Sequence, residues 1–263
     1  MSAKKLLLIP QLMYYGLRAP RDQAKAWDRF WGGIEKTGPE GQVLWDTDHP
    51  KEIEAVLSRV RAHMDLTLPL VDVGCGNGRF SRLLGARAPR VVGVDVSSQA
   101  IARARVESKD IAGITFQVLD IGAPGAAAAL HAELGDANVF MRGVLHVLDP
   151  KHRAAAAQNL STLLGTRGVA YLSETNIDGD PLDHLVLQGA TPTSMPDPLR
   201  RCIAAGIRPP SHFGDAEVRA YFPREEWDIV EGGPTTMFTV PLRTKTEIEE
   251  LSSYYAVVRR KRA

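Results

Sequence analysis

Three glycines lie at alternate positions in "VDVGCGNGRF", residues 71–80, and this loop constrains the fold of the chain more than any other feature. An apolar run precedes the loop and a helix-like stretch follows it. Because glycine has no Cβ, a strand, a glycine turn and a helix bring backbone N–H groups and the positive helix end close to a ligand. The motif therefore predicts a binding loop between a strand and a helix.

The residues around the glycines exclude two of the ligand classes that use such a turn. A phosphate-binding P-loop ends in Lys and then Ser or Thr, but Gly78 is followed by Arg79 and Phe80. A dinucleotide fingerprint has Gly or Ala where this chain has Arg79, whose side chain would obstruct close packing of helix on strand. What remains is the pattern D-x-G-x-G-x-G, which begins at Asp72 and ends at Gly78.

The chain after the loop predicts an α/β fold with a doubly wound, mostly parallel, seven-stranded sheet and helices on both faces. From residue 70 onward, short β-branched runs alternate with helix-like stretches, and ligands of such sheets bind at the carboxyl ends of the strands. The expected strands are 70–73, 90–95, 114–119, 137–141, 169–174, 227–231 and 254–259. The expected helices are 79–88, 98–107, 125–134, 150–164 and 215–222, preceded by an amphipathic helix over 49–64 with Ile53, Val56, Leu57, Val60 and Met64 on one face.

Two segments fall outside this alternating pattern. Residues 1–48 are rich in aromatic residues and interrupted by Gly and Pro, and we expect them to form an N-terminal helical cap or lid on a domain over 49–263. Residues 176–214 form a long insertion after the fifth strand, and such insertions usually build part of a binding site. Both segments are therefore expected on the substrate side.

Composition excludes several classes of function. With 32 basic and 31 acidic residues, the formal charge is +1, so we expect no nucleic-acid partner. Cys75 and Cys202 are too few for a disulfide framework or a zinc cage, which fits a protein of the reducing cytoplasm. The apolar run after Lys5 stops at Pro10, too short for a secretory signal or a membrane span, so no membrane partner is expected.

The glycine pattern and three later positions resemble the class I (Rossmann-like) S-adenosylmethionine-dependent methyltransferase family. Asp95 ends the second strand in "RVVGVDVSS", where a carboxylate can accept hydrogen bonds from both ribose hydroxyls. Asp120 ends the third strand, where the family has an acid that accepts from the adenine amino group. The third position is "VFMRGVLHVLD", which in the family runs under the methionine part of the cofactor. The resemblance covers residues 50–175 well and the last two strands loosely.

The resemblance implies S-adenosyl-L-methionine as cofactor, and each of the two acids also has a plain structural interpretation. Asp95 could cap the following helix, although Ser97 or Ser98 already fills that role, and Asp120 could be a turn aspartate before Gly122. The cofactor-binding residues that the resemblance implies are Asp72, Gly74, Cys75, Gly76, Asn77, Gly78, Asp95, Val96, Asp120, Ile121 and Arg142.

Methyl transfer from a sulfonium is an in-line displacement, so a catalytic base is needed only for a poorly nucleophilic acceptor such as a hydroxyl. His146 and Glu174 are the catalytic candidates; alternatively His146 packs at a helix start and Glu174 caps the sheet. His184 and His212 lie in the insertion, where a surface histidine is the default. The metal-binding alternative would use the oxygen donors Asp149, Glu174, Asn176 and Asp178, but their spacing fits no known pattern, so no metal is predicted.

The aromatic residues of the cap point to an enclosed site for a small, fairly apolar acceptor. Trp27, Phe30 and Trp31 share one helical face, which core packing alone would also explain. We expect five residues to contact substrate or form the lid: Tyr14, Tyr15, Trp27, Trp31 and His184. The predicted function is a transferase that methylates a small molecule, with a hydroxyl as the first choice. The alternatives are a nitrogen or sulfur acceptor, a non-catalytic S-adenosylmethionine-binding module, and a nicotinamide dehydrogenase.

Overall fold

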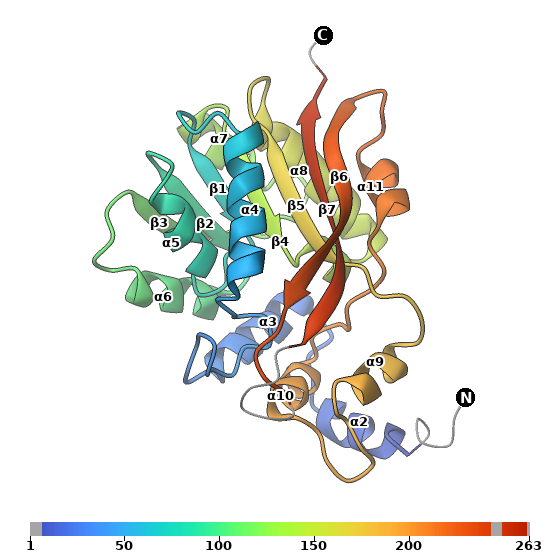
Figure 1. Ribbon diagram of the computed structural model, residues 1–263. Coiled ribbons are helices and arrows are strands. Elements are labelled where there is room, and N and C mark those ends of the chain that lie inside the picture. Colours follow the sequence, from blue (N-terminus) through green and yellow to red (C-terminus); the bar gives the residue numbers. More distant parts are fainter. Residues whose placement is uncertain (1–6, 243–248, 262–263) are drawn as a thin grey trace.

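A seven-stranded sheet flanked by helices forms the centre of the computed structural model, which describes residues 7–242 and 249–261 (Figure 1). Residues 1–6 of the predicted cap lie outside the described residues. The strands are β1 Leu70–Val73, β2 Val91–Asp95, β3 Ile114–Val118, β4 Asn138–Arg142, β5 Ala170–Thr175, β6 Trp227–Phe238 and β7 Glu250–Arg260. The helices are α2 Ile9–Gly16, α3 Gln23–Gly32, α4 Pro50–His63, α5 Arg79–Gly85, α6 Ser98–Glu107, α7 Ala128–Leu134, the 3₁₀ turn η1 Leu145–Val147, α8 Pro150–Leu164, α9 Pro181–Leu187, α10 Asp197–Ala205 and α11 Asp215–Tyr221.

The strand order is β3-β2-β1-β4-β5-β7-β6, and every strand pair is parallel except those that involve β7. The sequence prediction of a doubly wound, mostly parallel sheet is thus confirmed. β1 lies between β2 and β4, so the chain winds outward in opposite directions from this point. In open α/β sheets, ligands bind at the carboxyl ends of the strands where the order reverses in this way.

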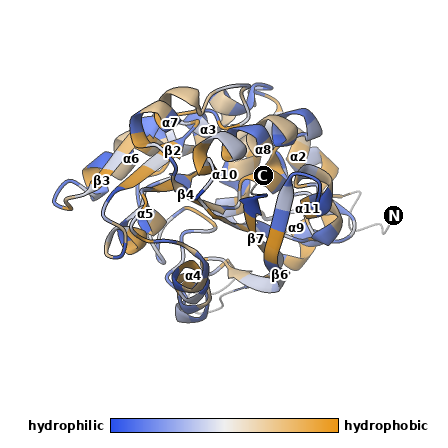
Figure 2. Ribbon diagram, turned by 90° about the horizontal axis from the view of Figure 1, so that it is seen from above, coloured by the Kyte–Doolittle hydropathy of each residue, from blue (hydrophilic) through white to orange (hydrophobic). Residues whose placement is uncertain are grey.

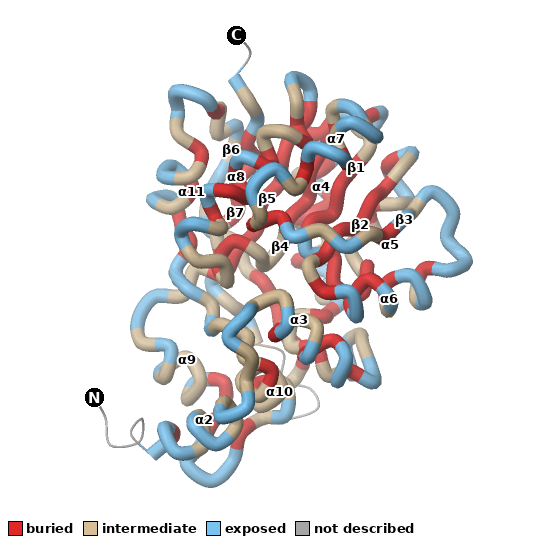
Figure 3. The backbone as a smooth tube through the Cα atoms, turned by 180° about the vertical axis from the view of Figure 1, so that it is seen from behind, coloured by how far each residue is buried: buried red, intermediate tan, exposed pale blue. Residues whose placement is uncertain are grey.

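Side chains of successive strand residues point to opposite faces of the sheet, and this alternation builds two separate cores. On β4, Val139 and Met141 join the core beneath α7, α8 and α11, while Phe140 joins the core beneath α4 and α5. Figure 2 shows α4 on one side of the sheet and α7 and α8 on the other. The inner strands β1, β2, β4 and β5 are buried on both faces, as the red tube at the centre of Figure 3 shows.

The last two strands are longer than the sequence predicts. The apolar pattern predicts 227–231 and 254–259, but β6 and β7 have 12 and 11 residues. They pair antiparallel along almost their whole length, with a register shift after Ile229. Because the backbone pairing continues through Gly232, Gly233 and Pro234, where no apolar alternation exists, the pattern of side chains could not reveal it.

The cap and the insertion meet each other at one end of the sheet (Figure 1). Helices α2 and α3 of the cap pack against α10 of the insertion, and two apolar clusters join them. One cluster is centred on Phe30 and Trp31, and the other on Leu8 and Leu199. The two segments that interrupt the α/β pattern are therefore a single structural layer.

Candidate active site

A cavity of about 1140 Å³ lies between the carboxyl ends of the strands and the layer formed by the cap and the insertion. We call the lining residues between 72 and 152 the strand wall, and those at 12–46 and 177–212 the lid wall. Pockets that hold one drug-sized ligand have volumes of roughly 300–1,000 Å³. The cavity therefore has room for a nucleoside-sized cofactor together with a small acceptor.

The glycine loop of the strand wall needs its glycines for two reasons. Gly74, Gly76 and Gly78 have φ values of +74°, +54° and +76°, the left-handed region that other residues rarely adopt. A Cβ on Gly74 would lie 2.3 Å from Cγ2 of Val144, and one on Gly76 would lie 2.8 Å from the ring of Trp31. The loop is thus bare partly because the strand wall and the lid wall both pack directly on it.

Asp95 ends β2 with both carboxylate oxygens facing backbone donors. Oδ2 accepts a hydrogen bond from Gly76 N at 3.0 Å, and Oδ1 accepts one from Ser97 N at 2.9 Å. Burial raises the pKa of Asp95 to about 6. Ser97 caps α6 by accepting from Ala100 N, so Asp95 is not the cap of that helix. Each oxygen retains a second lone pair, so the carboxylate can still accept from a pair of hydroxyls.

Asp72 and two arginines surround the amino-acid end of the predicted cofactor site. Asp72 accepts from Ser81 Oγ at 2.5 Å, and burial raises its pKa to about 7. Arg142 pairs with Glu52 at 2.5 Å, yet its Nη2 is buried with no hydrogen-bond partner among the described residues, and so is Nε of Arg79. Unpaired buried donors cost free energy, so guanidinium groups in this state fit a site that receives a carboxylate.

The other predicted cofactor residues line the cavity in different ways. Asp120 Oδ1 accepts a hydrogen bond from Gly122 N at 2.9 Å, which forms the turn expected as its structural role. Asp120 also lines the cavity, beside Ile121. Val96 lines the same wall. The side chain of Asn77 donates to Asp46 and Glu107, and that of Cys75 packs with Ile101, Ala104 and Phe116. These last two residues therefore have side chains engaged elsewhere and offer the cavity their backbone.

His146 and Glu174, the two catalytic candidates, form a buried pair. His146 Nδ1 lies 2.6 Å from Glu174 Oε2, and Glu174 also accepts from the backbone N–H groups of Val144 at 3.2 Å and His146 at 3.1 Å. Glu174 is fully buried and does not line the cavity, whereas His146 does. A carboxylate accepts hydrogen bonds, so in this pair Nδ1 is the ring nitrogen suited to donate and Nε2 is the one not engaged by Glu174.

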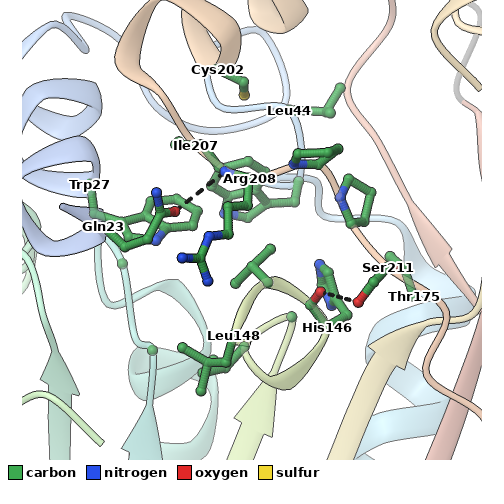
Figure 4. A pocket seen from close by; sticks show the side chains of 18 of the residues that line it. Gln23, Trp27, Leu44, His146, Leu148, Thr175, Cys202, Ile207, Arg208 and Ser211 are labelled. Carbon is green, nitrogen blue, oxygen red and sulfur yellow. Dashed lines mark hydrogen bonds between the residues drawn. The ribbon is translucent and has the colours of Figure 1, made fainter. Parts of the chain in front are cut away.

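A backbone clamp that the sequence did not reveal fixes the position of His146. The main-chain oxygen of His146 accepts from Ser211 N at 3.1 Å and from Ser211 Oγ at 2.6 Å (Figure 4). Arg153, buried in α8, donates to the main-chain oxygen of Leu145 at 2.7 Å. Such contacts join main-chain oxygens to residues distant in sequence, so no pattern of residue types could have indicated them.

The lid wall is mainly apolar and includes three of the five residues expected there. Trp27, Trp31 and His184 line the cavity, and burial lowers the pKa of His184. The structure does not bring Tyr14 and Tyr15 to the cavity: Tyr14 is 76% exposed, and Tyr15 packs among the helices of the lid layer. The sequence did not identify the remaining lid-wall residues, which include Leu12, Leu44, Trp45, Leu199, Cys202, Ile203, Ile207 and Arg208.

Two of the missed residues show what signal was available. Arg208 points into the cavity in Figure 4 and pairs with Asp149 at 3.2 Å, and nothing in the insertion sequence distinguishes it from a surface arginine. Glu52, which holds Arg142, is buried on α4. It stands four residues before Val56 and so places an acid on the apolar face of the predicted helix. A buried acid of this kind needs a cationic partner, which is a signal the sequence did contain.

Two further expectations concern what the described residues lack. Within residues 7–242 and 249–261, no group of three or more His, Cys, Asp or Glu side chains is arranged to hold a metal ion. In that same part of the chain, none of the helices has both the length and the apolar character needed to cross a bilayer. The candidate His212 lies 2.8 Å from Asp178 in the insertion, in an ion pair rather than in a metal cluster.

The family model that matches this chain covers most of the strand wall. Residues 70–168 match the family model of a methyltransferase domain. Among curated proteins, the chain is 30% identical over 109 residues to a ubiquinone biosynthesis O-methyltransferase of Leptothrix cholodnii, covering 41% of this chain and 45% of that protein. It is 32% identical over 121 residues to the protein of the same name from Paraburkholderia xenovorans, covering 46% and 50%. The chain thus spans about half the length of these relatives.

Solved structures match over nearly the whole chain. A crystal structure of an S-adenosylmethionine-dependent methyltransferase from Anabaena variabilis has 28% sequence identity and a TM-score of 0.79, with 92% of this chain and 97% of that chain covered. A structure from echinomycin biosynthesis has 20% identity and a TM-score of 0.64, which shows a shared fold. The match to the Anabaena protein therefore includes the lid layer as well as the sheet.

Proposed function

Because the chain belongs to the class I S-adenosylmethionine-dependent methyltransferases, we propose that it methylates a hydroxyl group of a small, largely apolar molecule, with His146 as the general base. The pairing of His146 with Glu174 carries the proposal: in a neutral imidazole whose Nδ1 proton is held by Glu174, Nε2 is the atom that would take the proton of the acceptor. A hydroxyl acceptor needs such a base to remove its proton. An amine or a thiolate can react without a base once it is correctly positioned.

The strand wall supplies groups suited to each part of the cofactor. Asp95 would accept from the ribose hydroxyls and Asp120 from the adenine amino group, while Ile121 would pack on the ring. The unpaired N–H groups of Arg142 and Arg79 suit the carboxylate. Bound S-adenosylmethionine supplies an activated methyl group on a positively charged sulfur, and the buried acids Asp72 and Asp95 do not oppose that charge.

The residues around His146 perform three tasks in this mechanism. Glu174 is a positioning residue: it accepts from Nδ1 and so keeps the lone pair of Nε2 available for the hydroxyl proton of the acceptor. Ser211 fixes the main chain at His146 and thereby the distance between Nε2 and the acceptor. The apolar lid wall excludes water, which would otherwise compete as a proton donor and weaken the electrostatic effects in the site.

The names of the curated relatives support an oxygen acceptor. Both are called O-methyltransferases, and they match 41% and 46% of this chain. The acceptor contacts lie largely in the lid wall, so the relatives do not name the acceptor of this chain.

The proposal is tested by a mutation that separates base catalysis from binding. Metabolite extracts are incubated with the protein and S-adenosylmethionine that carries a deuterated methyl group, and masses that gain one labelled methyl identify the acceptor. We expect His146→Ala to lower kcat by about 10²–10⁴-fold with unchanged affinity for S-adenosylhomocysteine. Glu174→Gln should lower kcat and change its pH profile while leaving KM nearly the same. Full turnover by His146→Ala would contradict the hydroxyl assignment and point to a nitrogen or sulfur acceptor.

A further inference from the structure

An apolar surface on helix α2 faces away from the cavity and is not used by the proposed reaction. The described residues have ten exposed large apolar side chains, and five of them lie between Leu7 and Leu17. Met13 is 67% exposed and Leu17 is 80% exposed. Contiguous exposed apolar surface of this kind marks a site of interaction with a protein or a membrane.

The helix carries apolar side chains on two opposite sides. Leu8, Leu12 and Tyr15 pack against α9 and α10 in the lid layer. Ile9, Met13 and Leu17, spaced four residues apart, form a stripe along the opposite side, which is exposed. α2 contains no charged residue, so the stripe is not interrupted by charge.

In the sequence, the charged residues up to position 21 are all positive. Residues 1–21 contain Lys4, Lys5, Arg18 and Arg21 and no acidic residue. Among the described residues, neither Arg18 nor Arg21 forms an ion pair. An apolar stripe beside unpaired cations is the pattern of a helix that lies in the surface of a bilayer containing anionic lipid.

We propose that the stripe of Ile9, Met13 and Leu17 docks the protein on an anionic lipid bilayer, and that the acceptor reaches the cavity from that bilayer. A second copy of this chain fits the surface less well, because a two-fold contact through the stripe brings the cations of both copies together. The sequence predicts no spanning segment, and a helix that lies in the surface needs none. This proposal departs from the expectation of no membrane partner, which was drawn from the absence of a signal or spanning segment in the sequence.

The position of α2 relative to the cavity supports the second part of the proposal, which rests on the proposed methyl transfer. Leu12 and Gly16 of α2 line the cavity, while Met13 of the same helix and Leu17, directly after it, are exposed. α9 packs beside α2 and likewise has Leu185 in the cavity lining and Leu187 exposed. The apolar lid wall is thus one helix away from the docking surface, which suits an acceptor that dissolves in lipid.

Vesicle flotation tests the docking independently of catalysis. The full chain is mixed with vesicles of phosphatidylcholine alone, or with a third of phosphatidylglycerol, and floated through a density gradient. We expect binding to the anionic vesicles, weakened by salt, and at least about tenfold weaker binding for the double variant Met13→Glu/Leu17→Glu. The matched control is Val106→Glu/Val118→Glu, which adds the same charge to exposed apolar positions on α6 and β3 and should bind almost as well as the parent.

Two further measurements separate the possible outcomes. Equal affinity of both double variants for S-adenosylhomocysteine, by calorimetry, shows that lost flotation is not misfolding. A parent chain that does not float with anionic vesicles overturns the proposal, as does equal flotation of the two double variants. The parent chain could instead sediment as a dimer that Met13→Glu/Leu17→Glu dissociates, and not bind vesicles. That result would identify a second copy as the occupant of the stripe and would also overturn the proposal. Vesicle binding by a chain that methylates no acceptor leaves the docking intact and contradicts the proposed function instead.

Discussion

The strand wall and the lid wall enclose the same cavity, but they use different kinds of chemistry. The strand wall presents carboxylates and backbone N–H groups at fixed places on a rigid sheet, and the family model matches it. The lid wall presents indole rings and aliphatic side chains from two segments that are distant in sequence, and the family model does not extend to it. We infer that the first wall serves the cofactor and the second the acceptor.

The largest effect is expected from a Gly→Ala substitution, which adds one methyl group, made separately in each wall. Gly74 and Gly206 both have a positive φ, and a Cβ on each would clash, with Val144 at 2.3 Å and with Pro20 O at 2.8 Å respectively. Gly74→Ala should lower the affinity for S-adenosylhomocysteine at least about 100-fold, because the whole binding loop must shift. Gly206→Ala should cost about 1–3 kcal/mol of stability but leave that affinity within about threefold. Calorimetry measures the affinity and thermal denaturation measures the stability. Equal loss of affinity in the two variants would contradict the assignment of cofactor binding to the strand wall alone.

The next largest effect is expected from Asp95→Ala in the strand wall. Loss of two charge-assisted hydrogen bonds to the ribose should weaken binding of S-adenosylhomocysteine on the order of 100-fold. KM for the acceptor should change little, because Asp95 lies in the other wall. The exposed Asp215 pairs with Arg219 outside the cavity, so Asp215→Ala is the control with no expected effect. Retained cofactor affinity in Asp95→Ala would contradict the ribose assignment.

The same contrast explains how much could be predicted from the sequence. The existence of the seven strands and the position of Asp95 were predictable, because short β-branched runs and a glycine turn have few alternative structures, although β6 and β7 extend beyond their predicted ranges. The pair formed by His146 and Glu174 was only half predictable: both residues were candidates, but their contact joins η1 to β5 across 28 residues of sequence. Leu199 and Ile207 could not be identified, because an apolar residue in an insertion has the same appearance whether it lines a cavity or a core.

A smaller effect is expected from pH, again on the strand wall alone. The pKa of Asp95 is raised to about 6 by burial, so the free protein protonates this carboxyl as the pH falls through that value. Ribose hydroxyls donate to the ionised form, so affinity for S-adenosylhomocysteine should fall about tenfold between pH 7.5 and pH 5. Asp72, with a pKa of about 7, shifts affinity in the same direction. Calorimetry on Asp95→Asn isolates the share of Asp95, and an unchanged slope in that variant would assign the whole effect to other groups.

The smallest effect concerns the link between the two walls. Asp28 on α3 accepts from Ser97 Oγ at 2.8 Å, Ser98 Oγ at 3.2 Å and Gln99 N at 3.2 Å, and so ties the cap to the first turn of α6. Because a hydrogen bond contributes about 1 kcal/mol, Asp28→Ala should raise the dissociation rate of S-adenosylhomocysteine about fivefold by letting the lid open more often.

Asp136 provides the matched control for this link, because it also accepts three hydrogen bonds, from Thr166 and Arg167, but just before the amino end of β4. Asp136→Ala should lower thermal stability by a similar amount and leave the dissociation rate unchanged in stopped-flow measurements. If the two variants release the ligand equally fast, the effect of Asp28 is general destabilisation. If only Asp28→Ala releases it faster, the walls differ in chemistry but act together, since the one specific to the acceptor also controls how long the cofactor stays bound.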